Sequence, residues 1–271
     1  MLVSMLFDTH THLDQSDFDE NRAEGVERAR AAGVMQMIAV GCTAEDSRKC
    51  VRLAGEFEGV YAAVGIQPNY VAESKPGDWQ LIEQLANEPA VVAIGETGLD
   101  RYWDYTPFEQ QQEYFDRHMR LSEKLGLPFI VHMRDCDDDI MESLRQARQR
   151  GPLQGVMHSF TGDAKMAAEC IELGMHISFA GMLTFMKSED LRDCASTIPD
   201  DRLLVETDSP YLSPEPVRGK RPNEPAYVRH TAECLAKVRG VSLDEIAATT
   251  TTNARRFFGL DGVNGLKASD A

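Results

Sequence analysis

Short apolar runs rich in Val, Ile and Leu recur along the chain, and each is followed by a polar turn and then by a helical pattern. Continuous apolar runs of this length are typical of strands buried on both faces of a parallel sheet. The pattern therefore predicts eight strands, at residues 5–12, 34–41, 60–66, 90–96, 128–133, 153–160, 175–180 and 202–208.

Helical spacing fills the stretches between these runs. Apolar side chains share one face of residues 107–126, where Gly126 followed by Pro128 marks the end of the helix. Residues 163–173 show the same spacing and stop at Gly174. The alternation of strand and helix indicates an α/β fold with a parallel sheet.

Eight such repeats within 271 residues favour a single closed (β/α)8 TIM barrel, which typically needs about 250 residues. A doubly wound open sheet is the alternative. The tail adds C-terminal helices: residues 228–238 carry one apolar face, and "NARRFFGL" at 253–260 is expected to dock on the barrel. We expect residues 1–271 to form one hydrolase domain.

Polar side chains close five of the eight apolar runs, and in a parallel barrel the chemistry lies at that end of the strands. Since side chains alternate along a strand, His10 and His12 point the same way. Of the other histidines, His118 and His230 lie in helical patterns and are read as core-edge or surface residues, and His176 begins a strand run, at the wrong end for catalysis. The residues at strand ends are His10, His12, Glu96, His132, His158 and Asp208.

Each of these residues alone has an ordinary explanation. A single histidine after a strand is more often hydrogen-bonded than bound to a metal, and Glu96 or Asp208 alone could stabilise the start of a helix. Chance does not readily place all six at strand ends. The set as a whole therefore predicts a metal site.

Six ligands exceed the three or four that one zinc ion takes from a protein, so the set suits two divalent cations. We assign His10, His12 and Asp208 to one ion, His132 and His158 to the other, and Glu96 as the bridge. Asp208 is also the candidate general base, so Glu96 and Asp208 are the expected catalytic carboxylates. The metals considered are Mg, Mn and Zn.

The net charge of −16 and the pI of about 4.8 argue against a long duplex wrapped on this surface. They leave room for a phosphate-bearing substrate in a metal-rich cleft. Arg218, Lys220 and Arg221 follow the last strand and are candidates to bind phosphate, as is Arg134. A solvated basic loop is the alternative. The aromatic residues of 101–105 could stack a base or simply pack a loop.

Six scattered cysteines without a C-x-x-C pair are read as free thiols that pack in the interior. No apolar run approaches the length of a membrane span, and no export signal is recognised. We expect a cytoplasmic monomer with no obligate protein partner.

The motifs "DTHTHLD", "IGETGLD", "HMRD", "HSFTG" and "ETDSPYLSP" followed by "RGKRPNEP" resemble those of the TatD-type metal-dependent deoxyribonucleases of the amidohydrolase superfamily. The resemblance implies a TIM barrel, a divalent-metal hydrolase, the same six ligands, and often 3′→5′ exonuclease activity on single strands. One turn departs from the family: "GIQPNY" places Gln67 and Asn69 where imidazoles are common.

Three functions follow from these observations. The first is a two-metal deoxyribonuclease that acts on DNA ends. The second is a two-metal hydrolase of a small-molecule or aminoacyl ester or amide, because one fold serves many substrates. The third is a metal-stabilised scaffold without activity, which the presence of all six ligands argues against.

Overall fold

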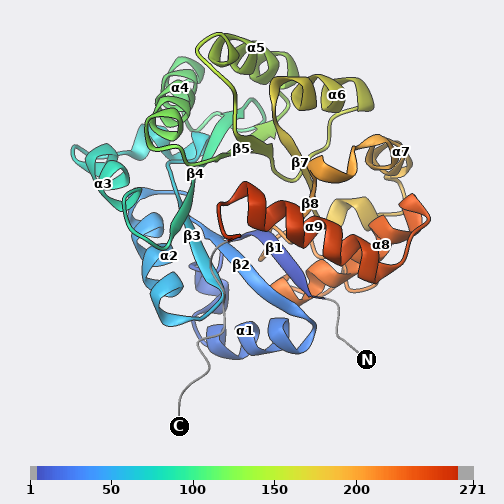
Figure 1. Ribbon diagram of the computed structural model, residues 1–271. Coiled ribbons are helices and arrows are strands. Elements are labelled where there is room, and N and C mark those ends of the chain that lie inside the picture. Colours follow the sequence, from blue (N-terminus) through green and yellow to red (C-terminus); the bar gives the residue numbers. More distant parts are fainter. Residues whose placement is uncertain (1–4, 262–271) are drawn as a thin grey trace.

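The computed structural model describes residues 5–261, and its strands form one eight-stranded parallel sheet in sequence order (Figure 1). Helices surround the sheet on the outside. The strands are β1 (Leu6–Thr11), β2 (Val34–Val40), β3 (Val60–Val64), β4 (Val91–Asp100), β5 (Phe129–Arg134), β6 (Gly155–Met157), β7 (His176–Phe179) and β8 (Leu203–Val205).

Hydrogen bonds between the first strand and the chain that follows the last one close the sheet into a barrel. Thr11 pairs in parallel with Ser209, and the amide of His12 donates to the carbonyl of Ser209 at 2.7 Å. The amide of Asp208 donates to the carbonyl of His10 at 2.9 Å. The predicted TIM barrel is therefore confirmed, and the open-sheet alternative is wrong.

The ends of some strands differ from the prediction. β4 continues past Glu96 to Asp100, because Gly98 pairs with His132 and Asp100 pairs with Arg134 of β5. β6 and β8 are only three residues long, so the polar residues expected to end them follow them instead. The predicted polar edge is thus made of both strand ends and the loops directly after them.

The connecting helices begin and end where the sequence supplies caps. The side chain of Thr43 accepts a hydrogen bond from the backbone amide of Asp46, and that of Asp163 accepts one from the backbone amide of Met166. Ser242 forms a capping box with Glu245. The helices are α1 (Arg22–Ala31), α2 (Ala44–Glu56), α3 (Asp78–Leu85), α4 (Phe108–Leu125), α5 (Asp137–Arg148), α6 (Ala164–Leu173), α7 (Glu189–Thr197), α8 (Val228–Arg239) and α9 (Leu243–Phe257).

Helix α9 covers the amino-terminal end of the barrel, as its position across the ring in Figure 1 shows. One buried cluster takes side chains from the strands and from α9 and the residues after it, including Phe7, Ile38, Ala254, Phe258 and Leu260. The rings of Phe7 and Phe258 lie 6.1 Å apart. The predicted docking of 253–260 is confirmed, and it fills the end of the barrel opposite the polar edge.

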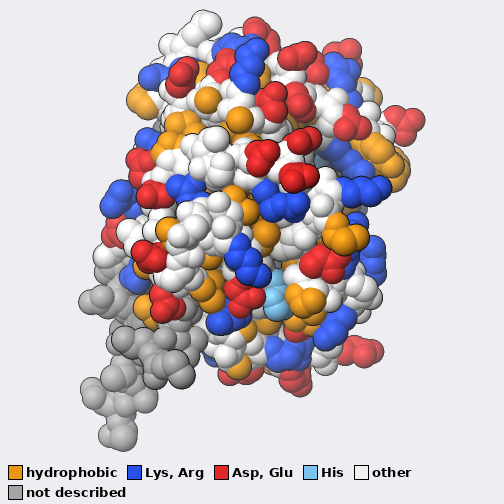
Figure 2. Space-filling model, turned by 90° about the vertical axis from the view of Figure 1, so that its right-hand side faces the viewer, with side chains coloured by type: hydrophobic (Ala, Val, Ile, Leu, Met, Phe, Trp, Pro, Cys, Tyr) orange, Lys and Arg blue, Asp and Glu red, His pale blue; other side chains and the backbone are white. Residues whose placement is uncertain are grey.

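The surface mixes charges of both signs. Figure 2 shows basic and acidic side chains interspersed over one face, without an extended basic band. Among residues 5–261, no helix combines the length and the apolar character that a bilayer span needs. All six cysteines are free thiols, and five of them are buried, as predicted.

Candidate metal centre

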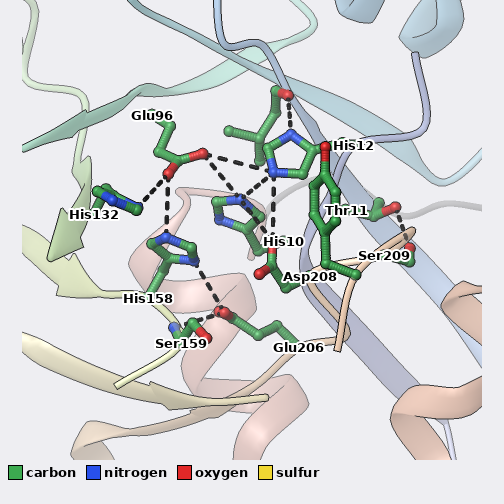
Figure 3. Close-up of polar contacts among 12 residues, drawn as sticks. His10, Thr11, His12, Glu96, His132, His158, Ser159, Glu206, Asp208 and Ser209 are labelled. Atoms are coloured by element: carbon green, nitrogen blue, oxygen red, sulfur yellow. Dashed lines mark hydrogen bonds and ion pairs between the residues drawn. The ribbon is translucent and has the colours of Figure 1, made fainter. Parts of the chain in front are cut away.

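The six predicted ligands converge at the carboxyl ends of the strands (Figure 3). His10 and His12 come from β1, Glu96 from β4 and His132 from β5, while His158 directly follows β6 and Asp208 lies in the chain after β8. Their side chains point toward one another although they lie up to 198 residues apart in the sequence, the separation of His10 from Asp208.

Glu96 lies between two pairs of histidines. Its Oε1 is 3.0 Å from Nδ1 of His132 and 3.3 Å from Nε2 of His158. Its Oε2 is 3.6 Å from Nε2 of both His10 and His12. Each carboxylate oxygen therefore serves one pair, which is the arrangement required of a ligand that bridges two ions.

Asp208 completes the group around the first pair. Its Oδ1 lies 3.4 Å from Nε2 of His12 and 3.8 Å from Nε2 of His10. The two imidazole Nε2 atoms are themselves only 3.3 Å apart. Lone pairs crowded in this way suit a shared cation, so the donor set of nitrogen and carboxylate oxygen fits a divalent metal.

The electrostatics of the cluster favour the metal-binding forms of Glu96, Asp208 and His10. Burial alone would raise the pKa of Glu96, yet the charge of His158 and hydrogen bonds from three histidines hold it well below its usual range. Burial opposes a low pKa at Asp208 too, and His12 and His158 outweigh it. Burial and the neighbouring His158 lower the pKa of His10. Two anionic carboxylates and a neutral imidazole are forms that bind metal. Neighbouring acidic groups raise the pKa of the other three histidines against the effect of burial, so a bound cation would have to displace their protons; these are His12, His132 and His158.

A second set of residues orients the imidazoles from outside. His12 Nδ1 donates to the carbonyl of Val40 at 3.0 Å, which leaves Nε2 free to face the cluster. His158 Nδ1 lies 3.2 Å from Glu206 Oε1, and His132 Nε2 lies 3.0 Å from Asp100 Oδ2. Such contacts fix the tautomer and the ring direction of metal-binding histidines.

Sequence reasoning missed Asp100 and Glu206. Each is a second carboxylate within a motif already recognised: Asp100 ends "IGETGLD", and Glu206 begins "ETD". A carboxylate two or four residues from a ligand was a usable signal, because alternate strand positions share a face. Cys42 was also missed as a neighbour of the site; its sulfur lies 3.6 Å from His12 Nδ1 and 3.9 Å from Glu96 Oε2.

The turn that departs from the family supports the cluster from behind. Gln67 Oε1 accepts a hydrogen bond from the amide of Asn69 at 2.8 Å. Asn69 Nδ2 donates to Asp100 Oδ2 at 2.9 Å, beside the contact from His132. The side-chain amide of Asn69 thus binds Asp100. Although burial opposes it, hydrogen bonds from His132 and Asn69 lower the pKa of Asp100 to about 2.

The basic candidates lie at the surface near this end of the barrel. Arg134 covers the ring of Tyr102 at 3.7 Å, and Arg218 covers that of Phe185 at 3.9 Å. Lys220 lines a surface hollow of about 640 Å³ together with Arg221. Their contacts within residues 5–261 do not bring them into the cluster, so their expected role in phosphate binding stays a prediction.

The remaining histidines lie elsewhere. His118 is fully buried in α4, not at the core edge as expected, and its Nε2 accepts from the amide of Ile66 at 3.0 Å. His176 begins β7, at the end of the barrel opposite the cluster. His230 lies 3.3 Å from Glu233 on α8. None of the three approaches the six ligands closely enough to share a metal with them among the described residues.

A parallel barrel with this cluster at the carboxyl ends of its strands defines a metal-dependent hydrolase. The model of the TatD related DNase family matches residues 7–259. The chain therefore belongs to that family, and the expectation of a hydrolytic enzyme is confirmed.

Individual relatives support this assignment. An uncharacterized metal-dependent hydrolase, YabD, from Bacillus subtilis is 39% identical over 94% of this chain and 99% of its own length. A Klebsiella pneumoniae protein named 3′-5′ ssDNA/RNA exonuclease TatD is 36% identical over 96% of this chain and 100% of its own. The crystal structure of YJJV, a TatD homolog from Escherichia coli, superposes with a TM-score of 0.88 at 29% identity, covering 95% of this chain and 99% of that one.

Proposed function

We propose that this enzyme uses two divalent metal ions to hydrolyse phosphodiester bonds at the 3′ end of single-stranded DNA. The observation that carries the proposal is the position of Glu96, whose two oxygens face separate histidine pairs at 3.0–3.6 Å. His10, His12 and Asp208 would hold one ion and His132 and His158 the other. The name of the Klebsiella relative supports the choice of substrate.

Two ions bound there would polarise the phosphate and lower the pKa of the attacking water. Asp208 has a lowered pKa, so its carboxylate is ionised at neutral pH and can accept the proton that the water releases. Val40, Asp100 and Glu206 hold the imidazoles in fixed directions, so the ligands do not have to reorganise during the reaction.

Exposed cations near the mouth of the site are proposed to bind the phosphates of the substrate. Arg134, Arg218 and Lys220 are the candidates, and all three side chains are exposed. The chain has a net charge of −16, and these three cations would make the potential locally positive where the substrate binds. We further propose that the chain acts as one hydrolase domain, as a monomer in the cytoplasm.

The test uses metal-stripped protein and single-stranded DNA labelled at its 5′ end, with Mg²⁺, Mn²⁺ or Zn²⁺ added in turn. The expected result is a metal-dependent ladder that shortens from the 3′ end and is absent with Asp208→Asn. A matched surface variant, Asp201→Asn, should cleave as the unaltered enzyme does. Intact DNA under every metal, together with hydrolysis of a small ester or amide, would overturn the choice of substrate.

A further inference from the structure

The exposed aromatic side chains of residues 5–261 gather at one end of the barrel. Each of them lies on a loop that follows the carboxyl end of a strand, on the side of the metal cluster. Aromatic rings elsewhere in the described chain are buried or half-buried. The exposed ones are Tyr70 after β3, Tyr102, Trp103 and Tyr105 after β4, and Tyr211 after β8.

Three of these rings form a continuous cluster on the loop after β4. Trp103 and Tyr105 are nearly parallel, with centroids 5.1 Å apart and an interplanar angle of 10°. Tyr102 meets Trp103 edge-on at 4.7 Å. The guanidinium of Arg134 lies 3.7 Å above Tyr102, and within residues 5–261 it forms no ion pair with a carboxylate. We call Tyr102, Trp103, Tyr105 and Arg134 the aromatic platform.

Packing does not account for the aromatic platform. Tyr102, Trp103 and Tyr105 are 53%, 41% and 57% exposed, so large parts of their rings face solvent. Trp79 shows the contrast, since it packs edge-on against His118 and Tyr114 and is half-buried. Adjacent exposed aromatic rings next to an unpaired cation are typical of a binding surface.

One buried carboxylate ties the platform to the metal cluster. Asp100 Oδ1 accepts hydrogen bonds from the amides of Tyr102 at 2.8 Å and Trp103 at 3.0 Å. The other oxygen of Asp100 is 3.0 Å from His132 Nε2. Arg134 is the residue that pairs with Asp100 across β4 and β5. The platform therefore has a fixed position next to the ligand His132.

We propose that the aromatic platform is a stacking site for an unpaired base of a single-stranded nucleic acid, next to the bond that is cleaved. Every base presents a flat π-face, so such a site binds without regard to sequence, and Arg134 adds a cation beside the neighbouring phosphate. A base within a duplex is already stacked and paired. The platform would thus select single strands, and this inference rests on the proposed function for its substrate class.

The chain carries only two tryptophans, Trp79 and Trp103, which gives a direct optical test. In an Asp208→Asn background expected to block cleavage, Trp79→Phe leaves Trp103 as the single tryptophan and Trp103→Phe leaves Trp79, and excitation at the red edge selects tryptophan over the seven tyrosines. A short oligodeoxythymidylate should quench emission in the first protein and not in the second. An oligonucleotide of equal length without bases should quench neither. Binding of the labelled oligonucleotide, detected by anisotropy, without quenching of Trp103 would overturn the stacking site.

A kinetic test gives a second readout. The ratio of kcat/KM for oligodeoxythymidylate to that for bis-nitrophenyl phosphate, which has no nucleobase, should fall about tenfold in Tyr105→Ala, the loss expected for one stacked base. The control Trp79→Phe should keep the ratio of the unaltered enzyme. An unchanged ratio in both Tyr105→Ala and Trp103→Ala would contradict the proposal.

The outcomes separate this inference from the proposed function. If DNA quenches Trp103 but is not cleaved with any of the metals, the proposed nuclease activity is wrong and the stacking site stands. Cleavage of DNA without quenching would keep the nuclease activity and remove the stacking site. DNA that is neither bound nor cleaved would overturn both.

Discussion

At the scale of single residues, Glu96 has the most demanding position in the molecule. It is 3% exposed and is the carboxylate that faces all four histidines of the cluster. Its role as a bridge follows from the number of ligands and stays a prediction, and its two oxygens face separate histidine pairs. Asp100 and Glu206 were not predicted, because their spacing of two or four residues from a ligand, although a usable signal, is also found for carboxylates that cap a turn.

Replacing Glu96 by Gln tests the bridge. The amide keeps the shape and loses the charge, so we expect metal content to fall from the proposed two ions per chain to one or fewer. Activity should fall by about a hundredfold or more, since even residues behind the ligands have effects of 10–100-fold. Elemental analysis of the reconstituted protein gives the stoichiometry. Two tightly bound ions in Glu96→Gln would contradict the bridging role; Glu88→Gln is the exposed control.

Replacing Asp100 by Asn tests the support behind His132. The variant removes the charge that faces His132 Nε2 at 3.0 Å, and we expect a loss of about 10–100-fold in metal affinity. Titration with Mn²⁺ measures the affinity. The surface variant Asp104→Asn, on the same loop, should bind metal normally. Equal affinity of both variants would mean that Asp100 does not orient this ligand.

His118 makes folding stability depend on pH. Burial lowers its pKa from 6.5 to about 4, so between these values the unfolded chain binds a proton that the folded chain does not. The stabilisation is complete above pH 6.5 and declines as the pH falls toward 4, by on the order of 3 kcal/mol in total.

Urea unfolding of unaltered protein and of His118→Gln at about pH 7 and about pH 5 measures this effect. The glutamine can still accept the hydrogen bond from Ile66, and the variant should lose less stability on acidification than the unaltered protein. An equal loss in both proteins would show that His118 does not carry the effect.

At the scale of elements, β4 carries both the ligand Glu96 and the supporting carboxylate Asp100, whereas the sequence predicted only Glu96 on this strand. The predicted run ended at Glu96, because the apolar residues end there. The strand continues to Asp100 because β5 lies beside it, and pairing with a neighbour is not visible in the local pattern of one strand. The eight strands and the helices at 107–126, 163–173 and 228–238 followed from periodicity, whereas the extension of β4, and with it Asp100, did not.

Gly98 lets β4 pass close to β5. Its φ is 136°, and a Cβ at this position would lie 2.0 Å from the carbonyl oxygen of His132. Gly98→Ala should therefore displace β5 and destabilise the fold by more than Gly126→Ala, a variant at positive φ with open space around it. The latter should cost about 1–2 kcal/mol. Urea unfolding compares the two; equal losses would show that the close approach is relieved without cost.

At the scale of the whole molecule, the number of repeats and the chain length predicted a closed barrel with additional C-terminal helices. The sequence also indicated that 253–260 packs on the barrel. The sequence did not indicate which end of the barrel this stretch covers, because an apolar pattern predicts burial but not the surface against which a segment packs. The structure places Ala254 and Phe258 in the interior cluster formed by the strands.

Phe258 tests how much this end closure stabilises the molecule. Its side chain is 4% exposed and contacts the ring of Phe7, so Phe258→Ala should lower the free energy of unfolding by about 3–5 kcal/mol. Phe257→Ala, at the half-buried neighbouring position, should cost less. Chemical denaturation measures both. A smaller loss at Phe258 than at Phe257 would contradict the structural importance of the interior contact.

The closure by α9 and the packed interior also leave the six ligands open to approach from one end of the barrel alone. His10, Glu96 and His158 are at most 6% exposed, and the side chains of the interior cluster lie beyond them. A polymer that reaches these ligands enters and leaves on the same side. The terminus of a strand can do so directly, whereas an internal segment must double back on itself. For the proposed nuclease we therefore expect a preference for strand ends over internal segments, independently of which residues bind the bases.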